Sequence, residues 1–306
     1  MKFRRLGKTE LKVSVIGIGT WQYGGEWGRD YTQREVDSIL AAAVESGINL
    51  IDTAECYGDH FSEALVGRAM RRNRYRWVVA TKFGHHYKGL FERDQLWSAE
   101  EVKKQLEDSL RALKLETIHL YQFHSGDNEA FDNQDLWTML DKQVQAGKIL
   151  HLGISVSHSN PQYRTHQTER ATEVGAETIQ VVYNRLDRSA EEDMFPCCIE
   201  QDLGVLARVP LASGFLSGKY LAGSNFDPTD VRSKQSGEEI AEIVRQVEKI
   251  KEEVPAGVSM ASWALAWCLK HPAVSCVIPG CKNPDQVRQN AAAVDMVTGD
   301  HRLDAG

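Results

Sequence analysis

Four polar residues stand at or just beyond the ends of apolar stretches that should form buried strands. Asp52 lies near the end of INLIDT, Lys82 near the end of WVVATKF, and His124 closes IHLYQFH. Tyr57 follows Asp52 by five positions. Each residue alone has an ordinary explanation as a helix cap, a surface phenol, a structural ion-pair partner or a hydrogen-bonded core histidine. Together, at the ends of three consecutive strands, they favour a shared site.

The four residue types fit acid catalysis on a carbonyl group. A free tyrosine has a pKa of about 10 and is a poor acid at neutral pH. A nearby ammonium group stabilises the phenolate, so Lys82 should lower the pKa of Tyr57, while Asp52 holds the ammonium and keeps it charged. Tyr57 could then give its proton to a developing alkoxide, and His124 could donate a second hydrogen bond to the same oxygen. This combination suits carbonyl reduction.

The strand ends belong to a series of short apolar runs rich in valine and isoleucine. The runs are nearly continuous rather than alternating, which is typical of parallel strands covered on both faces. Eight such runs occur, at 13–19, 48–53, 77–83, 118–124, 149–155, 178–184, 204–210 and 273–280. If the strands close into a barrel, their carboxyl ends meet at one mouth, where barrel enzymes keep their chemistry.

Helical patterns separate the strands and complete a (β/α)8 barrel of the α/β class. Helices are predicted at 34–47 after Thr32 as N-cap, at 98–113 with a capping box from Ser98 and Glu101, at 239–253, at 261–270 and at 283–294 after Asn283. Two of them fall between strands seven and eight, so that crossover holds an extra helix. The stretch FRRLGKTELKVS predicts an N-terminal hairpin at the barrel floor. We expect one barrel domain over residues 1–306, close to the typical size of about 250 residues.

A carbonyl reductase requires a hydride donor, and the sequence places its site in the late loops. Near the N-terminus GIGTWQ begins as G-x-G but has Gln22 where a Rossmann fingerprint needs glycine, and no helix opens there. The loops PLASGFLSGK (210–219) and PGCKNPDQVRQN (279–290) follow strands seven and eight, where barrels commonly bind phosphate. Lys282 and a free helix N-terminus add positive potential there.

Composition narrows the class of protein further. The 306 residues are 42% hydrophobic and carry a net charge of -7, so nothing in the bulk charge attracts nucleic acid or an anionic membrane. No apolar run approaches the roughly 20 residues of a membrane span, and the N-terminus lacks the apolar region of a signal peptide. The six cysteines form no C-x-x-C pair, which suits a reducing cytosol. We therefore expect a cytoplasmic enzyme acting on a small molecule.

With these residues in place, the sequence resembles the aldo-keto reductases over nearly its whole length. The matching stretches are RRLGKTELKVSVIGIGTW, IDTAECYG, ATKFG, the His124 position, GIS, IQVVYN, PLASGFLSGKY and IPGCKNPDQVRQN. The resemblance implies a barrel that binds extended NADP(H) without a Rossmann fold and transfers a hydride between the nicotinamide and an aldehyde or ketone. It places Asp52, Tyr57, Lys82 and His124 on the family's catalytic tetrad, with Tyr57 as proton donor.

The resemblance also implies which residues hold the cofactor. They are Gly19, Thr20 and Trp21 after strand one, Ser155 and Gln180 at the carboxamide, Arg208 at the nicotinamide face, Leu211, Ser213, Gly214 and Lys219 on the pyrophosphate side, and Gly280, Lys282, Gln286, Gln289 and Asn290 at the adenosine phosphate. Three positions depart from common members. Val156 replaces an asparagine beside the carboxamide serine, Arg208 replaces a stacking tyrosine, and Gly280 lacks a side chain for the 2′-phosphate. Lys282 leads us to expect NADPH over NADH.

Aromatic residues and two loops are candidates for the substrate pocket. The loops at 85–97 and 218–234 should overhang the mouth, and the wall candidates, any of which could equally be core packing, are Trp21, Tyr23, Trp27, Phe91 and Trp97. His85 and His86 are adjacent and would point apart, and no carboxylate stands at ligand spacing from them, so no metal site is expected.

Two other functions remain open from the residues alone. A lysine at a strand end suits a Schiff-base lyase, although a partner such as Asp52 should keep Lys82 protonated. Channel-associated β-subunits resemble reductases and keep the tetrad, so a regulatory NADP-binding role is the second alternative.

Overall fold

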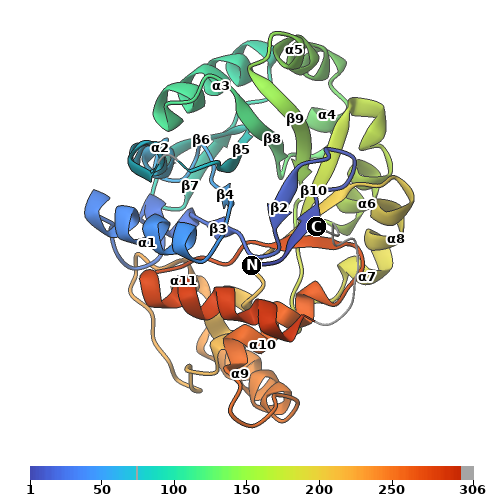
Figure 1. The fold of residues 1–306 in the computed structure, drawn as a ribbon. Helices are drawn as coiled ribbons and strands as arrows, with labels where there is room; N and C mark the ends of the chain where they lie inside the picture. The colour runs from blue at the N-terminus through green and yellow to red at the C-terminus, as the bar shows by residue number, and fades with distance from the viewer. Residues whose placement is uncertain (74, 298–306) are drawn as a thin grey trace.

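In the computed structural model, which describes residues 1–73 and 75–297, eight parallel strands curl into a barrel ringed by helices (Figure 1). Around the barrel the strands are β3 (Ile18–Gly19), β4 (Leu50–Asp52), β5 (Val78–Phe83), β8 (Ile118–His124), β9 (Ile149–Ser155), β10 (Ala176–Val182), β11 (Gly204–Arg208) and β12 (Val274–Val277). Parallel bridges between Ile16 and Val277 and between Gly19 and Gly280 join the first strand to the last. The predicted (β/α)8 barrel is confirmed.

The strands largely follow the predicted apolar runs. Strands β8 and β9 have the expected bounds, β10 has the expected length but begins and ends two residues earlier, and the others are shorter. The run at 13–19 is divided, because its first residues pair within the N-terminal hairpin and only Ile18–Gly19 joins the barrel. The expected domain over 1–306 extends into residues 298–306, which lie outside the described part of the chain.

The helices begin where polar capping residues precede apolar patterns. Thr32, Ser98 and Ser236 each form a capping box, and the Asn283 side chain accepts a hydrogen bond from the backbone N–H of Gln286. The α-helices are α1 (Gln33–Glu45), α2 (Phe61–Asn73), α3 (Ala99–Leu113), α4 (Asn128–Phe131), α5 (Gln134–Gln145), α6 (Pro161–Glu169), α7 (Ala190–Asp193), α8 (Phe195–Glu200), α9 (Gly237–Lys251), α10 (Met260–Leu269) and α11 (Pro284–Ala291).

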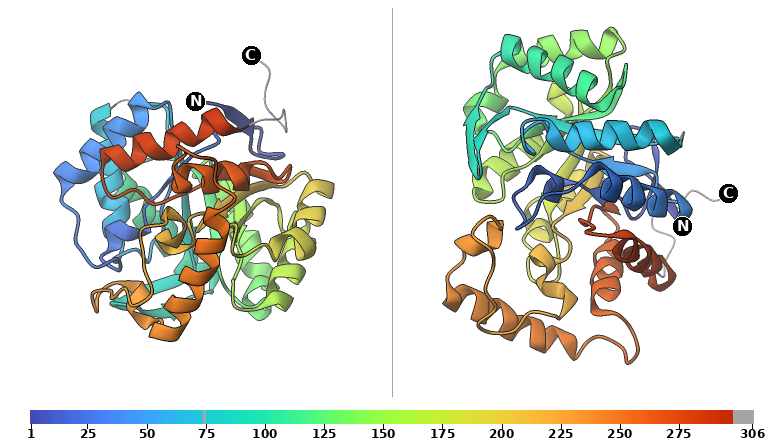
Figure 2. Two further views of the ribbon diagram at one scale, coloured as in Figure 1. Left: turned by 90° about the horizontal axis from the view of Figure 1, so that it is seen from below. Right: turned by 90° about the vertical axis from the view of Figure 1, so that its left-hand side faces the viewer.

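Short 3₁₀ turns complete the helical elements of the described residues: η1 (Trp21–Gly24), η2 (Thr172–Val174), η3 (Ala212–Ser217), η4 (Val231–Lys234) and η5 (Ala292–Met296). Helix α9 is the expected extra helix between β11 and β12. It stands apart from the ring of helices in the right view of Figure 2. Its apolar face, including Ile240, Val244 and Val247, forms a separate core cluster with η3 and α10.

The N-terminal hairpin of β1 (Phe3–Arg5) and β2 (Lys12–Ser14) closes the barrel floor, as predicted. Leu6 and Val13 are fully buried in one cluster with apolar side chains from strands β4, β5, β8, β11 and β12. The guanidinium of Arg4 is buried as well, and it donates hydrogen bonds to the backbone carbonyls of Val274 (2.6 Å) and Leu269 (2.9 Å). The hairpin is thus tied to the last βα unit of the barrel.

At the opposite end, two long segments cover part of the mouth. Residues 85–97 form an antiparallel hairpin of β6 (His85–Gly89) and β7 (Glu92–Gln95), which the sequence indicated only as a loop. Residues 218–234 run as an irregular segment into η4, and their Asp230 forms an isolated bridge with Trp27. Both segments therefore lie where the sequence placed them.

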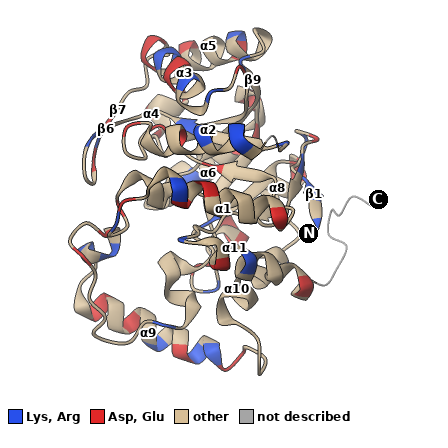
Figure 3. Cartoon of the chain, turned by 60° about the vertical axis from the view of Figure 1, so that its left-hand side comes forward, with Lys and Arg blue, Asp and Glu red and all other residues tan. Residues whose placement is uncertain are grey.

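The outer surface carries both signs of charge. Lysine and arginine positions are interspersed with aspartate and glutamate positions along the helices in the ribbon of Figure 3. Among the described residues, none of the helices has the length and apolar character that crossing a bilayer requires.

A close contact between α2 and α3 gives a stability prediction. A Cβ atom added to Gly67 of α2 would lie 2.6 Å from the carbonyl oxygens of Ala112 and Leu113. Gly67→Ala should therefore lower the free energy of unfolding by about 1–3 kcal/mol through overpacking. Gly237 at the start of α9 meets nothing within 4 Å, so Gly237→Ala is the matched control and should stay within about 0.5 kcal/mol. Urea denaturation followed by circular dichroism measures both, and equal stabilities would contradict the contact.

Candidate active site

The register of the parallel strands brings the predicted residues to one edge of the barrel. Asp52 pairs with Ala80, Lys82 with Gln122, and His124 with Ser155 across successive strands. Because parallel strands end at the same edge, the side chains of these residues lie together at the carboxyl-terminal mouth.

Asp52 and Lys82 form a buried ion pair at the base of this mouth. The Lys82 Nζ lies 2.7 Å from Asp52 Oδ1, and its side chain is 1% exposed. Nζ also donates to the backbone carbonyl of Thr53 at 2.6 Å and to the Tyr57 hydroxyl at 3.4 Å. Burial alone would lower the pKa of Lys82, but the charges of Asp52 and Tyr57 raise it above its usual range. The ammonium therefore stays charged at neutral pH.

The second oxygen of Asp52 is held by two amides. Gln180 Nε2 donates to Asp52 Oδ2 at 2.7 Å, and Gln122 Nε2 does so at 3.3 Å. Gln180 also donates to Gln122 Oε1 at 3.2 Å, which fixes the orientation of both amides. The sequence analysis did not single out Gln122, although its position two residues before His124 on β8 places it on the same barrel face.

Tyr57 reaches the ion pair from the loop after β4. Its backbone packs directly on Gly24, where an added Cβ would lie 2.6 Å from the Tyr57 carbonyl carbon. The Trp21 ring stacks beside the phenol, with centroids 6.3 Å apart. Burial raises the pKa of Tyr57 to about 12, although the Lys82 charge acts to lower it. The lowered pKa expected from the sequence is therefore corrected: desolvation outweighs the ammonium, and the phenol is protonated at neutral pH.

His124 lies across from the Tyr57 phenol, with ring centroids 6.3 Å apart and planes at 81°. Burial, reinforced by the positive charges of Lys82 and Arg208, holds the pKa of His124 well below its usual value. The imidazole is therefore neutral at pH 7. A neutral imidazole keeps one N–H and can still donate a hydrogen bond.

These residues border a cavity of about 350 Å³ at the barrel mouth. Tyr57, Asp52 and His124 line it, while Lys82 lies behind them. All the predicted cofactor residues except Ser155 line the same cavity: Gly19, Thr20, Trp21, Gln180, Arg208, Leu211, Ser213, Gly214, Lys219, Gly280, Lys282, Gln286, Gln289 and Asn290. The Ser155 side chain is instead buried and donates to Gln180 Oε1 at 3.4 Å.

One end of the cavity is basic. Lys219, Arg232 and Lys282 all line it, and Arg232 is paired with the buried Asp230. Burial and the neighbouring charges of Arg232 and Lys219 lower the pKa of Lys282. Cations that repel one another in a partly buried cavity are stabilised by an anion, so this end fits a phosphate. The sequence analysis did not predict Arg232 as a cavity residue, because it treated the segment 218–234 only as a loop over the mouth.

The aromatic wall is smaller than expected. Trp21 and Trp27 line the cavity, but Tyr23 is fully buried against Tyr31 in the core. Phe91 lies under the Lys234 ammonium, and Trp97 packs on Phe123, so neither is part of the wall. The β6–β7 hairpin contributes Arg93 and His85 instead. Arg93 is held there by an ion pair with the buried Glu26. The sequence analysis singled out neither Arg93 nor Glu26.

With this geometry established, comparison with known sequences decides the family. The sequence profile of the Aldo/keto reductase family matches residues 15–303. The chain belongs to the aldo/keto reductase family. The resemblance inferred from the sequence is thereby confirmed, and the barrel and the position of the cavity agree with it.

Two relatives and one solved structure illustrate the breadth of this family. The uncharacterized oxidoreductase YqkF of Bacillus subtilis is 32% identical over 300 residues, covering 96% of this chain and 92% of its own. A probable voltage-gated potassium channel subunit beta of Arabidopsis thaliana is 27% identical, covering 97% and 92%. The structure of the aldo-keto reductase AKR11C1 from Bacillus halodurans (holo form) matches with a TM-score of 0.80 and 28% identity, covering 96% of this chain and 91% of that one.

The buried ion pair gives a second stability prediction. Lys82→Met leaves the Asp52 carboxylate without its cation in a dry site, so we expect the free energy of unfolding to fall by about 3–5 kcal/mol. The double variant Asp52→Asn with Lys82→Met removes both charges and should recover much of that loss. Chemical denaturation of the wild type, both single variants and the double variant measures the coupling. A double variant as unstable as Lys82→Met would contradict the pair as the origin of the effect.

Proposed function

We propose that this reductase transfers a hydride between NADP(H) and a small aldehyde or ketone, reducing the carbonyl to an alcohol with Tyr57 as proton donor. The observation that carries the proposal is the Tyr57 hydroxyl, which borders the cavity 3.4 Å from an ammonium that Asp52 holds in place. Family membership supports an oxidoreductase, and the residues of this cavity supply the finer assignment.

The proton transfer follows from the state of each group. Tyr57 is protonated at neutral pH because burial raises its pKa to about 12. When the carbonyl oxygen gains negative charge, the phenol gives its proton to that oxygen and becomes a phenolate. The Lys82 ammonium stabilises the phenolate, and Asp52 keeps Lys82 charged and correctly placed. A general acid positioned in this way contributes about 10²–10⁴-fold to the rate.

His124 has a positioning and charge-stabilising role in this proposal. Its neutral ring can donate one hydrogen bond to the carbonyl oxygen without competing with Tyr57 as the acid. Trp21 and Trp27 supply the apolar wall on which a small carbonyl compound would rest. The substrate partner is thus a small organic aldehyde or ketone.

The basic end of the cavity fits the phosphate groups of a dinucleotide. Lys219, Lys282 and Arg232 would hold the phosphates, and Gln286, Gln289 and Asn290 from α11 add polar groups there. Gln180 and Arg208 border the end nearest Tyr57 and would hold the nicotinamide. When bound, the nicotinamide supplies or accepts the hydride. The remaining member of the predicted set, Ser155, would reach the cofactor only if its hydrogen bond to Gln180 were exchanged.

Two alternatives are less well supported. A Schiff-base lyase needs a neutral amine, and Lys82 is held charged by Asp52. A regulatory role draws support from the channel-subunit relative, and turnover with a small carbonyl substrate distinguishes it from catalysis. All six cysteines lie in the described part of the chain and none of them forms a disulfide, which is compatible with the cytoplasmic, reducing location that we propose.

Tyr57→Phe tests the proton donor. The variant keeps the ring and should bind cofactor normally, but turnover should fall by about 10²–10⁴-fold because the acid is lost. Tyr23→Phe is the matched control, since the buried Tyr23 hydroxyl makes no hydrogen bond to the described residues and lies outside the cavity lining. NADPH oxidation with a panel of aldehydes measures turnover, and cofactor fluorescence measures binding. Unchanged turnover in Tyr57→Phe with full cofactor binding would show that another group is the acid.

Lys282→Ala tests the choice of NADPH over NADH. A charge-assisted hydrogen bond to the 2′-phosphate is worth about 1.5–3 kcal/mol, so the NADPH dissociation constant should rise roughly ten- to a hundredfold while that of NADH stays nearly unchanged. Lys234→Ala, which removes an exposed lysine of η4 outside the cavity lining, is the control and should change neither constant. Fluorescence titration at fixed ionic strength measures both constants. Equal losses for the two cofactors would show that Lys282 does not contact this phosphate.

A further inference from the structure

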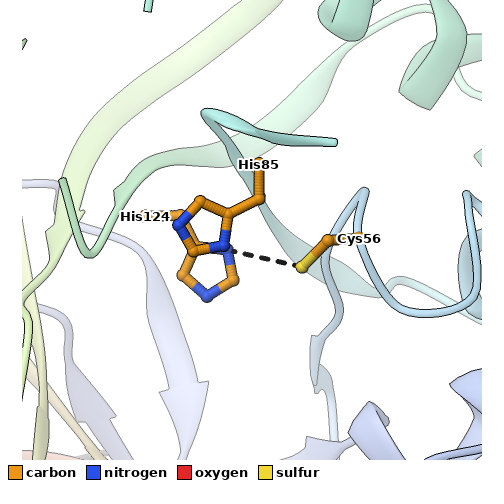
Figure 4. Close-up of side chains that lie close together, drawn as sticks. All are labelled: Cys56, His85 and His124. Atoms are coloured by element: carbon orange, nitrogen blue, oxygen red, sulfur yellow. Dashed lines mark hydrogen bonds between the residues drawn. The ribbon is translucent and has the colours of Figure 1, made fainter. Parts of the chain in front are cut away.

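Three potential metal ligands converge on the wall of the cavity, and the proposed reduction leaves two of them without a role. The Cys56 Sγ and one ring nitrogen each of His85 and His124 all lie within 4.8 Å of one another (Figure 4). All three residues border the cavity. His85 was considered in the sequence only beside His86, and the structure instead joins it to residues far away in the chain.

The spacing is close to that of a tetrahedral zinc centre. Zinc bonds of about 2.3 Å to sulfur and 2.0–2.1 Å to nitrogen place those two ligand atoms about 3.6 Å apart in a regular tetrahedron. The Cys56 Sγ lies 3.9 Å from His124 Nδ1. This pair would need to move by a few tenths of an ångström, and the other two pairs of ligand atoms lie within 4.8 Å. Three protein ligands leave a fourth position open toward the cavity, as in catalytic rather than structural zinc sites.

The three ligands are held by separate elements that constrain one another. Cys56 is buried in the loop after β4, His85 begins β6, and His124 ends β8. The two imidazoles stack with centroids 4.6 Å apart and planes at 18°. The backbone N–H of His85 donates to Glu55 Oε1 at 2.9 Å, which anchors the start of the β6–β7 hairpin beside Cys56. A metal ion lies in the plane of each imidazole that binds it, and stacked planes do not meet close to the rings, so one of the two rings would have to turn when the ion binds.

A buried carboxylate faces the cluster. Glu55 is only 2% exposed, and its Oε1 lies 3.7 Å from His124 Nδ1. Its other oxygen is buried without a hydrogen-bond partner among the described residues. A buried carboxylate oxygen left unpaired is costly, and a divalent ion nearby would compensate it.

Positive groups also face the cluster, and most of them are already neutralised. The Lys82 ammonium is paired with Asp52, and the Arg93 guanidinium is paired with Glu26. Arg208 is close enough to His124 for its charge to lower the pKa of that imidazole, so it also repels a cation bound there. Glu55 offsets that charge, so the balance at the three ligands does not oppose a divalent ion.

We propose that Cys56, His85 and His124 form a binding site for a Zn²⁺-class transition-metal ion in the mouth of the barrel. Cysteine thiolate and imidazole are the ligands that zinc prefers over magnesium or calcium. On binding, the Cys56 thiol releases its proton to solvent and the resulting thiolate bonds the metal. Each neutral imidazole contributes a nitrogen lone pair, and no oxidation or reduction takes place.

Occupation of the site would stop the reaction, a consequence that rests on the proposed function. His124 would be bonded to the metal, and a divalent charge would stand beside the Tyr57 phenol with its open coordination position in the cavity. A carbonyl oxygen would then meet the ion instead of the phenol. The chain would thereby act as a reductase that bound zinc reversibly inhibits.

Cobalt substitution tests the site without relying on activity. The purified full-length protein, titrated with Co²⁺ under reducing conditions, should develop a thiolate-to-cobalt charge-transfer band and the visible bands of a four-coordinate ion, and added Zn²⁺ should bleach both. Cys56→Ser should abolish the charge-transfer band. His85→Gln should weaken binding by about tenfold or more. The matched controls are His86→Gln, which removes the exposed neighbouring histidine, and Cys197→Ser, which removes a half-buried thiol elsewhere; both should bind as the wild type does.

The outcomes separate the metal site from the proposed function. A charge-transfer band that survives Cys56→Ser, no band in the wild type, or equal loss in the His85 and His86 variants would overturn the site. Far-ultraviolet circular dichroism checks that each variant is folded, and His85→Gln tests the site independently if Cys56→Ser does not fold. If carbonyl reduction is absent but the cobalt bands appear and depend on Cys56, the site stands and the proposed function falls. If reduction is present and unaffected by Zn²⁺ that is bound at the site, the inhibitory consequence is wrong.

Discussion

The architecture of the mouth depends on one buried ion pair, between the Lys82 ammonium and the Asp52 carboxylate. Two adjacent strands end in opposite charges at 2.7 Å, and each charge is tolerable in the interior only because of the other. Gln122, Gln180 and the backbone of Thr53 satisfy the remaining hydrogen-bonding capacity. The pair thus fixes where β4, β5, β8 and β10 end relative to one another, and Tyr57 takes its position from that arrangement.

Burial also determines the protonation states of the Tyr57 phenol and the His124 imidazole. A phenol in a dry cavity keeps its proton, and an imidazole in the same cavity stays neutral. Both groups therefore enter a reaction as hydrogen-bond donors, with Lys82 supplying the only charge that directly contacts the Tyr57 hydroxyl among the described residues. In the proposed reduction, the proton would therefore leave Tyr57 only as negative charge develops on the substrate oxygen.

Much of this arrangement is predictable from the sequence, because apolar runs define the strands and a parallel barrel brings their ends together. That reasoning locates Asp52, Lys82 and His124 without any structure. It fails for Tyr57's pKa, because a motif gives the neighbouring charge but not the loss of solvent. It also fails for Cys56 and His85, whose closeness depends on a hairpin over the mouth rather than on spacing. Arg93 is missed because the same hairpin was taken for a loop, and Arg232 is missed because its irregular segment has no periodicity that reveals where a side chain points.

The hairpin at the barrel floor determines from which end of the barrel a ligand can reach the cavity. Leu6 and Val13 fill the lower end of the barrel, and Arg4 fastens that plug to β12 and α10. The cavity lies at the opposite end, partly roofed by the β6–β7 hairpin and the segment around Arg232. Any ligand of the cavity must therefore enter and leave through the same opening at the barrel mouth. Two molecules bound there together would have to leave in order, the one nearer the opening first.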